Sequence, residues 1–371
     1  MSELIQKNGD RATIRWKLLT GASALALTGY ISSATLAKAE DGRPVLWLDL
    51  GGQFQSLTDP SEIWAPPNLP SVIDHRIAGV LNQKPRIGYD VDGSITYQPP
   101  GSDWSFSAAI QYGKAKKGPK ADHDQTYKTH YAYNSKYVWT NYAFTDLHAV
   151  QETKHVILDF QAGRDVGLGL LGGHGSSMLK IGIRVAQFRE KANSLMTAQT
   201  NVPAKYDIYT GAFLNASMHD TRSFSGIGPS IAWNGSIPMA GSLEDGLALD
   251  LGVDAAFLFG RQKTKAGTHA HKSELVSIIP TGYISGLGPV YKPIFATPTN
   301  STRTSARDRR VTVPNLGGLV GLSFRKGDAK ISFGYKADFF FNAIDGGVAT
   351  AKKENRGFYG PFASVSIGIG D

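Results

Sequence analysis

Charged residues alternate with apolar residues in several segments of this chain, and this pattern is the first one with chemical content. Asp90 and Asp92 alternate with Tyr89 and Val91. Successive side chains of an extended strand point to opposite faces, so the two acids share one face. Acids and bases on the inner face of a closed sheet either pair with one another or line a water-filled path for ions. The sequence leaves these two alternatives open.

The same periodicity assigns a set of charged residues to the polar face of the strands. These residues carry both signs of charge, which suits either an ion path or a paired network. The candidates for the lining of a pore are Asp49, Arg86, Asp90, Asp92, Asp159, Lys180, Arg184, Asp250, Asp254, Arg325, Lys336 and Asp338.

Other spacings with known chemistry are weak here. Gly167, Gly169 and Gly172 match G-x-G-x-x-G, but a dinucleotide site needs a helix next, and the sequence continues with another strand pattern. His269 and His271 lack a third ligand nearby in sequence. No H-E-x-x-H, G-x-S-x-G or P-loop spacing occurs. We therefore expect no enzyme activity, no cofactor and no metal site, although a histidine and a carboxylate meeting at an outer rim would support a barrel enzyme.

Ten segments have the alternation that would position these charges. They are residues 45–56, 85–97, 104–112, 154–166, 179–185, 223–235, 247–259, 317–325, 331–342 and 358–369. Short turns connect the second segment to the third, the fourth to the fifth, the sixth to the seventh and the eighth to the ninth. Long polar stretches at about 116–152, 191–220, 263–311 and 344–356 follow the third, fifth, seventh and ninth segments. This asymmetry is typical of an antiparallel up-and-down transmembrane β-barrel with short periplasmic turns and long extracellular loops. Residues 131–144 and 206–218 also alternate, so twelve strands remain an alternative to ten.

Composition agrees with an all-β membrane protein. The chain has 371 residues, 41% of them hydrophobic, and no cysteine. Its mean hydropathy of -0.20 is too low for a bundle of spanning helices but suits strands with one wet face. A soluble β-sandwich also alternates, but its short turns occur at both ends of the sheet. The sequence therefore predicts one barrel domain over residues 40–371, in the bacterial outer membrane.

The first 39 residues have the pattern of a secretory signal peptide. Lys7, Arg11, Arg15 and Lys17 precede a short apolar segment, and Ala37-Lys38-Ala39 provides a cleavage motif. We expect cleavage between Ala39 and Glu40.

The long stretch between residues 261 and 310 is basic, with nine Lys or Arg against two acids. Arg303, Arg307, Arg309 and Arg310 gather near its end. A basic outer loop could hold the phosphates of outer-membrane lipid, including lipopolysaccharide, or draw anions to a pore. A solvated loop is the alternative. Nothing in the charge pattern indicates a nucleic-acid partner.

Several segments resemble the pore-forming outer-membrane proteins typified by the Legionella major outer-membrane protein. They are Leu158-Asp159-Phe160-Gln161-Ala162-Gly163, Phe224-Ser225-Gly226-Ile227-Gly228-Pro229, Leu258-Phe259-Gly260 and Tyr359-Gly360-Pro361-Phe362, in the family's order over about residues 154–369. Gly226 and Gly228 would face inward and Pro229 outward, so we interpret that motif as shaping the barrel.

The resemblance implies a porin-like β-barrel that passes small hydrophilic solutes or ions by diffusion and is inserted by the barrel-assembly machinery. The alternative is a non-conducting barrel that acts as a surface anchor or adhesin through its loops. The solute, the ion preference, the state of the lumen and the oligomeric state stay open.

Overall fold

The computed structural model describes residues 45–58, 86–131, 138–167, 175–201, 213–242, 245–273, 275–284, 288–295, 297–346 and 353–370. Within these ranges, the regular elements are strands, listed in chain order: β1 (Leu46–Thr58), β2 (Arg86–Tyr97), β3 (Trp104–Tyr131), β4 (Val138–Asp165), β5 (Ser176–Asn201), β6 (Phe213–Gly241), β7 (Asp245–Ser273), β8 (Leu275–Ile284), β9 (Gly288–Phe295), β10 (Thr299–Lys326), β11 (Ala329–Asp345) and β12 (Lys353–Ile369). The expected signal peptide and its cleavage site at Ala39 and Glu40 lie outside the described residues.

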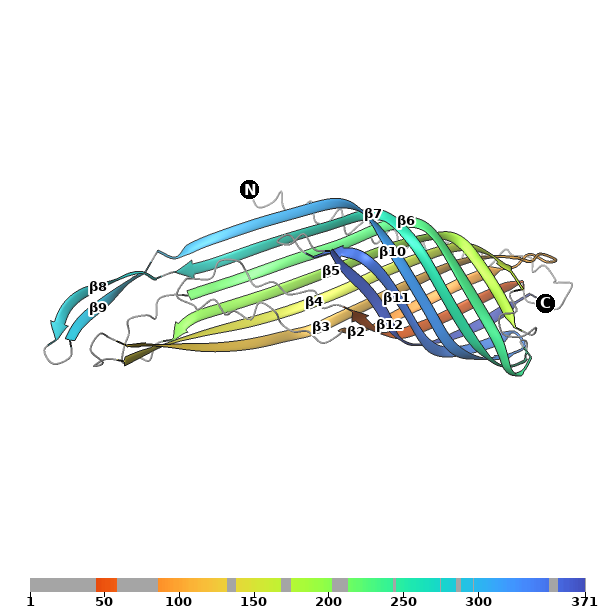
Figure 1. Ribbon diagram of the computed structural model, residues 1–371, viewed down its shortest axis with the longest axis horizontal. Helices are drawn as coiled ribbons and strands as arrows, with labels where there is room; N and C mark the ends of the chain where they lie inside the picture. Colours follow the sequence, from red (N-terminus) through yellow and green to blue (C-terminus); the bar gives the residue numbers. More distant parts are fainter. Residues whose placement is uncertain are drawn as a thin grey trace.

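Ten of these strands close into one antiparallel barrel, as the sequence predicted. The order around the barrel is β1-β12-β11-β10-β7-β6-β5-β4-β3-β2. Closure occurs where β1 pairs with β12, with Leu46 opposite Ile369. A hydrogen bond from the Val45 amide to the Gly370 carbonyl extends this seam at the end of the barrel that carries the short turns. Figure 1 shows the strand ends that adjoin these turns gathered at one end of the barrel, with the strands running obliquely away from it.

The alternation of the sequence becomes an outer apolar surface and an inner polar one. Phe257 and Phe259 on β7 point outward and are each 57% exposed, whereas Leu258 between them is fully buried. The other exposed apolar side chains of the ten strands extend this surface around the barrel. A lipid-facing wall of this kind is the expected outside of an outer-membrane barrel.

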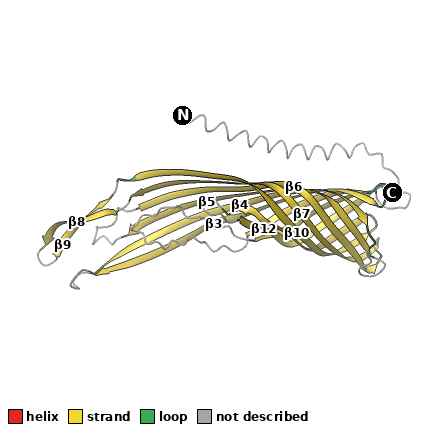
Figure 2. Cartoon of the chain, turned by 45° about the horizontal axis from the view of Figure 1, so that its top comes forward, coloured by secondary structure: helices red, strands yellow, loops and turns green. Residues whose placement is uncertain are grey.

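Six neighbouring strands run far beyond the length that a membrane requires. β3, β4, β5, β6, β7 and β10 have 26 to 29 residues each, whereas about 9–11 residues cross a bilayer. β1, β2, β11 and β12 have 12 to 17 residues. One side of the barrel therefore continues outward as a tall curved sheet, and Figures 1 and 2 show this extension.

The prediction of long loops is wrong over most of their predicted length. Residues 116–131 and 138–152 continue β3 and β4, and residues 263–273 and 299–311 continue β7 and β10. The described parts of 131–144 belong to β3 and β4, and those of 206–218 belong to β6, so they add no strand to the barrel. Two further strands do occur, because β8 and β9 form a separate hairpin beyond the end of β7.

The glycine–proline motif of β6 shapes the wall. Gly226 and Gly228 are buried on the inner face, and Pro229 is exposed on the outer face, as predicted. A Cβ atom at Gly228 would lie 1.8 Å from the carbonyl oxygen of Phe257, so the two backbones approach too closely for any larger residue.

A bulge near the outer end of β11 was not predicted. The register with β12 shifts between Phe340 and Ile344, and Asn342 has a φ of 57°. The Asn355 side chain accepts a hydrogen bond from the Asn342 amide at 2.8 Å. The bulge adds residues to one strand and bends it there. Just beyond the bulge, both Ile344 and Asp345 are buried.

No helix in the described part of the chain is long and apolar enough to span a membrane. The described residues also contain no group of three or more His, Cys, Asp or Glu side chains arranged to hold a metal ion.

Candidate functional site

The interior of the barrel is the candidate functional site, and the inward residues of β5 show how it is organised. Along this strand, Arg184, Phe188 and Glu190 all face inward and are at least nine-tenths buried. A basic residue is thus followed by an aromatic ring and then by an acid. The neighbouring strands repeat this order of polar, apolar and polar side chains. The interior therefore consists of two charged clusters separated by an apolar layer.

The aromatic layer is built from rings on four strands. It comprises Phe188, Phe224, Phe340 and Phe358, which are 0–2% exposed, with Leu57, Ile157, Leu258, Val313 and Ile344 around them. The ring centroids of Phe188 and Phe340 are 4.7 Å apart, and those of Phe188 and Phe358 are 5.7 Å apart.

The contact between Phe188 and Phe358 spans the lumen. β5 and β12 are five positions apart in the ten-strand order, so they lie opposite each other. The four rings thus meet across the middle of the barrel rather than along its wall. In the described structure, packed apolar side chains fill the lumen at this level.

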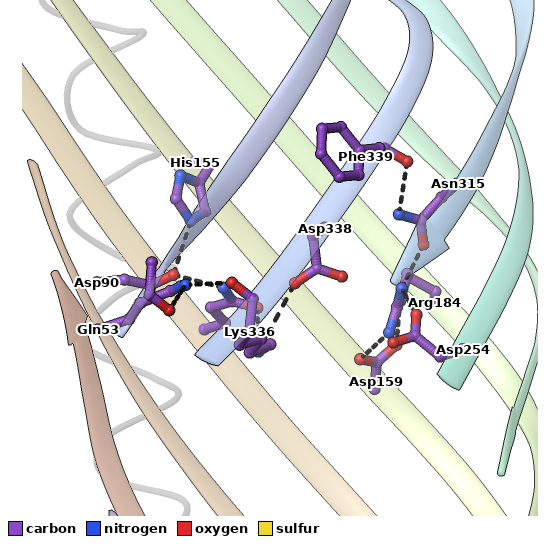
Figure 3. Close-up of polar contacts among 12 residues, drawn as sticks. Gln53, Asp90, His155, Asp159, Arg184, Asp254, Asn315, Lys336, Asp338 and Phe339 are labelled. Carbon is purple, nitrogen blue, oxygen red and sulfur yellow. Dashed lines mark hydrogen bonds and ion pairs between the residues drawn. The ribbon is translucent and has the colours of Figure 1, made fainter. Parts of the chain in front are cut away.

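The charged cluster between this layer and the short turns is called the inner cluster here. Arg184 binds Asp159 through two contacts, Nε to Oδ1 at 2.7 Å and Nη2 to Oδ2 at 2.9 Å. Its Nη1 donates to Asp254 at 2.6 Å and also to Asn315. Figure 3 shows these partners converging on the guanidinium. Arg184 thereby ties β5 to β4, β7 and β10.

A second centre of the inner cluster is Lys336 on β11. Its ammonium lies 3.7 Å from Asp338 and donates to Gln111 at 3.2 Å. Gln111 also donates to Asp90, and Asp90 lies 3.2 Å from Nε2 of His155. The His155 ring packs on Phe358 with a centroid distance of 4.0 Å, so this chain of contacts ends at the aromatic layer.

The end of the interior nearest the turns carries further charges. Lys330 pairs with Asp250 at 2.7 Å, Ser94 donates to Asp49 at 2.6 Å, and the Arg325 guanidinium lies 4.6 Å from the centre of the Trp47 ring. Among the inward side chains below the aromatic layer that the structure describes as buried or half-buried, there are seven acids against five bases. The acids are Asp49, Asp90, Asp92, Asp159, Asp250, Asp254 and Asp338, and the bases are Lys180, Arg184, Arg325, Lys330 and Lys336.

The outer cluster lies on the other side of the aromatic layer. Arg356 on β12 and Glu190 on β5 meet across the lumen at 2.6 Å, with side chains 0% and 2% exposed. Arg222 contacts Asp220 at 2.6 Å and Glu354 at 3.4 Å.

A further part of the outer cluster surrounds the buried carboxylate of Asp345, just beyond the β11 bulge. Asp345 accepts from Arg307 Nε at 2.9 Å and pairs with Arg309 at 3.1 Å. The outer cluster thus matches four arginines with four acids and is electrically balanced.

The predicted residues are distributed unevenly over these features. Eleven of the twelve pore-lining candidates lie on the inner face below the aromatic layer; Arg86 begins β2, but its side chain lies outside the described part. The four predicted loop arginines all lie in β10. Arg303 and Arg310 are exposed, whereas Arg307 and Arg309 face inward onto Asp345. The loop assignment was wrong because both faces of β10 are polar in this part, so the sequence lacks the alternation of apolar and polar residues that indicates a strand.

The sequence analysis did not identify the aromatic layer or the outer cluster. The parity that places Arg184 inward also places Phe188 and Glu190 inward, and this signal could have found them. The histidine–carboxylate pair that a barrel enzyme would need occurs as His155 and Asp90. It is buried beneath the aromatic layer rather than placed at an outer rim.

Solved structures with similar architecture have very different sequences. The transport unit of the autotransporter AIDA-I from Escherichia coli is 7% identical over 91% of this chain and 94% of that chain, with a TM-score of 0.25. The toluene transporter TodX from Pseudomonas putida is 9% identical over 86% and 88%, with a TM-score of 0.15. No curated protein matches the chain.

The chain also matches a protein-family model over most of its length. The model described as Legionella pneumophila major outer membrane protein precursor matches residues 78–369, which include every barrel strand except β1. The closed barrel with its apolar outer wall agrees with that match, and the chain therefore belongs to the Legionella major outer membrane protein family and is a β-barrel of the bacterial outer membrane.

Proposed function

We propose that this barrel is a gated channel for small hydrophilic solutes and ions, with the aromatic layer as its gate. The observation that carries the proposal is the order of the interior: two charged compartments separated by one apolar constriction. Hydrophobic constrictions close channels by excluding water, whereas charged walls favour hydrated ions on either side. Charge of both signs within a barrel of intermediate width is consistent with this arrangement.

The inner cluster supports a preference for cations in the open state. Seven acids against five bases leave two negative charges in excess among the buried and half-buried inward side chains, and the outer cluster is balanced. A narrow passage lined by surplus carboxylates favours cations. We expect no catalysis, because the buried His155–Asp90 pair is enclosed by packing on Phe358 rather than open to a substrate.

A second candidate is a closed barrel that displays its tall outer sheet to a partner at the cell surface. The buried Glu190–Arg356 pair favours it, because a link between opposite walls resists opening. In that case the charged clusters and the aromatic layer act as a core, as side chains do in small filled barrels.

Single-channel conductance of the purified chain in a planar bilayer tests the first proposal. We expect rare, brief openings of the unmodified protein. A Phe188→Ala and Phe358→Ala double variant removes both rings of the contact across the lumen, so its time-averaged current should rise at least about tenfold because the constriction widens. A salt gradient should give a reversal potential on the cation side.

The matched control is the Phe257→Ala and Phe333→Ala double variant, because both rings face outward and are more than half exposed. Heat-dependent gel mobility confirms that each barrel is folded. Silence of a correctly folded Phe188→Ala and Phe358→Ala variant would contradict the channel and favour the display barrel.

A further inference from the structure

The outward-facing residues change abruptly from uncharged to charged along β3, β4, β5, β6, β7 and β10. One row of residues that lie opposite each other in register is Ile110, Leu158, Val185, Ile227, Phe259 and Thr312, with no charge. Away from the short turns, the next three outward-facing rows are charged. On each of β3, β4, β5, β7 and β10, the first charged outward residue in these rows is a base: Lys114, Lys154, Arg189, Arg261 and Arg310.

These three rows are called the basic belt here. Their bases are Lys114, Lys116, Lys154, Arg189, Lys191, Arg261, Lys263, Lys265 and Arg310, and their acids are Glu152 and Asp308. Nine bases and two acids give the belt a net charge of +7. The outward charges at the turn end of the wall are mixed instead, as in the exposed pair of Arg164 with Asp103. The positive excess therefore marks only the outer boundary of the lipid-facing surface.

The two acids neutralise only part of the belt. Glu152 lies 2.7 Å from Lys154 and 3.8 Å from Lys114. Asp308 lies 4.0 Å from Arg261 and 3.9 Å from Lys263. Among the described residues, Arg189 and Arg310 have no acidic partner.

Like charges face each other directly in the belt, which is the second observation. Arg261 is the register partner of Arg310, and Lys154 is the register partner of both Arg189 and Lys114. Directly opposed side chains in an antiparallel pair are about 4.5–5.5 Å apart at Cβ, and like charges there destabilise the sheet. An anion between them would remove this repulsion and would be held by charge-assisted hydrogen bonds.

We propose that the basic belt binds the phosphate groups of outer-leaflet lipid, with the Arg261–Arg310 and Lys154–Arg189 pairs as its two phosphate sites. The position of the belt supports lipid as the source of the phosphate. The belt begins one row beyond the apolar wall, where the acyl chains of the lipid end and the headgroups begin. Arginine suits this role because its planar guanidinium binds phosphate through two hydrogen bonds. The inference concerns the outer surface of the wall and does not depend on whether the lumen conducts.

Thermal unfolding of the detergent-purified full chain with added lipid A tests the proposal. Lipid A with both phosphates should raise the unfolding temperature, because a ligand that binds only the folded state stabilises it. Lipid A lacking phosphates should raise it much less. The variant Lys154→Gln, Arg189→Gln, Arg261→Gln and Arg310→Gln should lose most of the increase, yet unfold at the same or a higher temperature without lipid, since it lacks the opposed like charges.

The control variant combines Arg164→Gln with Lys326→Gln, which removes exposed bases at the turn end and should keep the full response to lipid A. If the fourfold variant does not fold, the two paired double variants take its place, and each should lose part of the response. An equal response of the belt variants and the unmodified chain would overturn the proposal. A full response to inorganic phosphate alone would overturn lipid as the source.

Discussion

The inner and outer clusters occupy the same barrel, yet they hold their charges differently. The outer cluster matches four arginines with four carboxylates, and Arg356 and Glu190 are almost fully buried. The inner cluster has more acids than bases and includes Lys180 and Lys336 as well as Arg184. Buried charges are stable only when paired. The outer cluster therefore has the design of a structural link, whereas the inner cluster retains charge that could act on an ion.

The largest expected effect comes from breaking the link in the outer cluster. Arg356→Met should lower the free energy of unfolding by about 3–5 kcal/mol, because it leaves Glu190 buried without its guanidinium. Denaturant titration of the variant inserted in lipid vesicles measures this loss. The double variant Arg356→Met with Glu190→Leu removes both charges and should recover most of it. A loss below about 1 kcal/mol in the single variant would show that water reaches this site.

The second-largest loss of stability is expected at the border between the inner cluster and the aromatic layer. A Cβ atom at Gly113 would lie 2.1 Å from Cε1 of His155. Gly113→Ala should therefore displace the His155 ring from Phe358 and Asp90 and destabilise the barrel by about 1–3 kcal/mol. Gly267→Ala is the matched control, because a Cβ atom there meets nothing within 4 Å. Equal stability of the two variants in denaturant titration would show that His155 is free to move.

A third prediction concerns the effect of Lys336 on ion preference rather than on the stability of the barrel. Lys336→Met removes a base that faces Asp338 and Gln111, so the acid excess of the inner cluster grows by one charge. In the Phe188→Ala and Phe358→Ala background, we expect a larger reversal potential on the cation side in a salt gradient. Arg309→Met in the outer cluster is the comparison variant, and it should move the reversal potential less. An equal change in both would contradict the division of roles between the clusters.

The alternation in the sequence assigned the charged residues of the inner cluster to the inner face for a physical reason. Below the aromatic layer, the outer face of each strand lies against lipid and is apolar, so the period of two is easy to recognise. Phe257 and Asp254 on β7 illustrate the two faces. The number of barrel strands and the position of the short turns follow from the same contrast.

The outer cluster was missed because this contrast disappears where the wall leaves the lipid. Above that level, the outward residues include Lys154 and Arg189, and the inward ones include Glu190 and Arg222. Both faces are then polar, and a continuing strand has the composition of a loop. Backbone hydrogen bonds to the neighbouring strand still satisfy its peptide groups, so the strand persists without any apolar periodicity. The bulge at Asn342 was also not predicted, and the hydrogen-bond partners of its backbone, Gln262 and Asn355, are distant in sequence.

The smallest expected effect concerns a pair outside both clusters. Arg164 and Asp103 lie 3.1 Å apart at the turn end, with side chains 54% and 70% exposed. Water and salt screen such a pair, so Arg164→Gln should change the free energy of unfolding by no more than about 0.5 kcal/mol. Both pairs join an arginine to a carboxylate, so a larger loss of stability in Arg356→Met than in Arg164→Gln would be due to burial. A loss as large as that of Arg356→Met, measured by the same denaturant titration, would show that pairing in this barrel stabilises the fold irrespective of exposure.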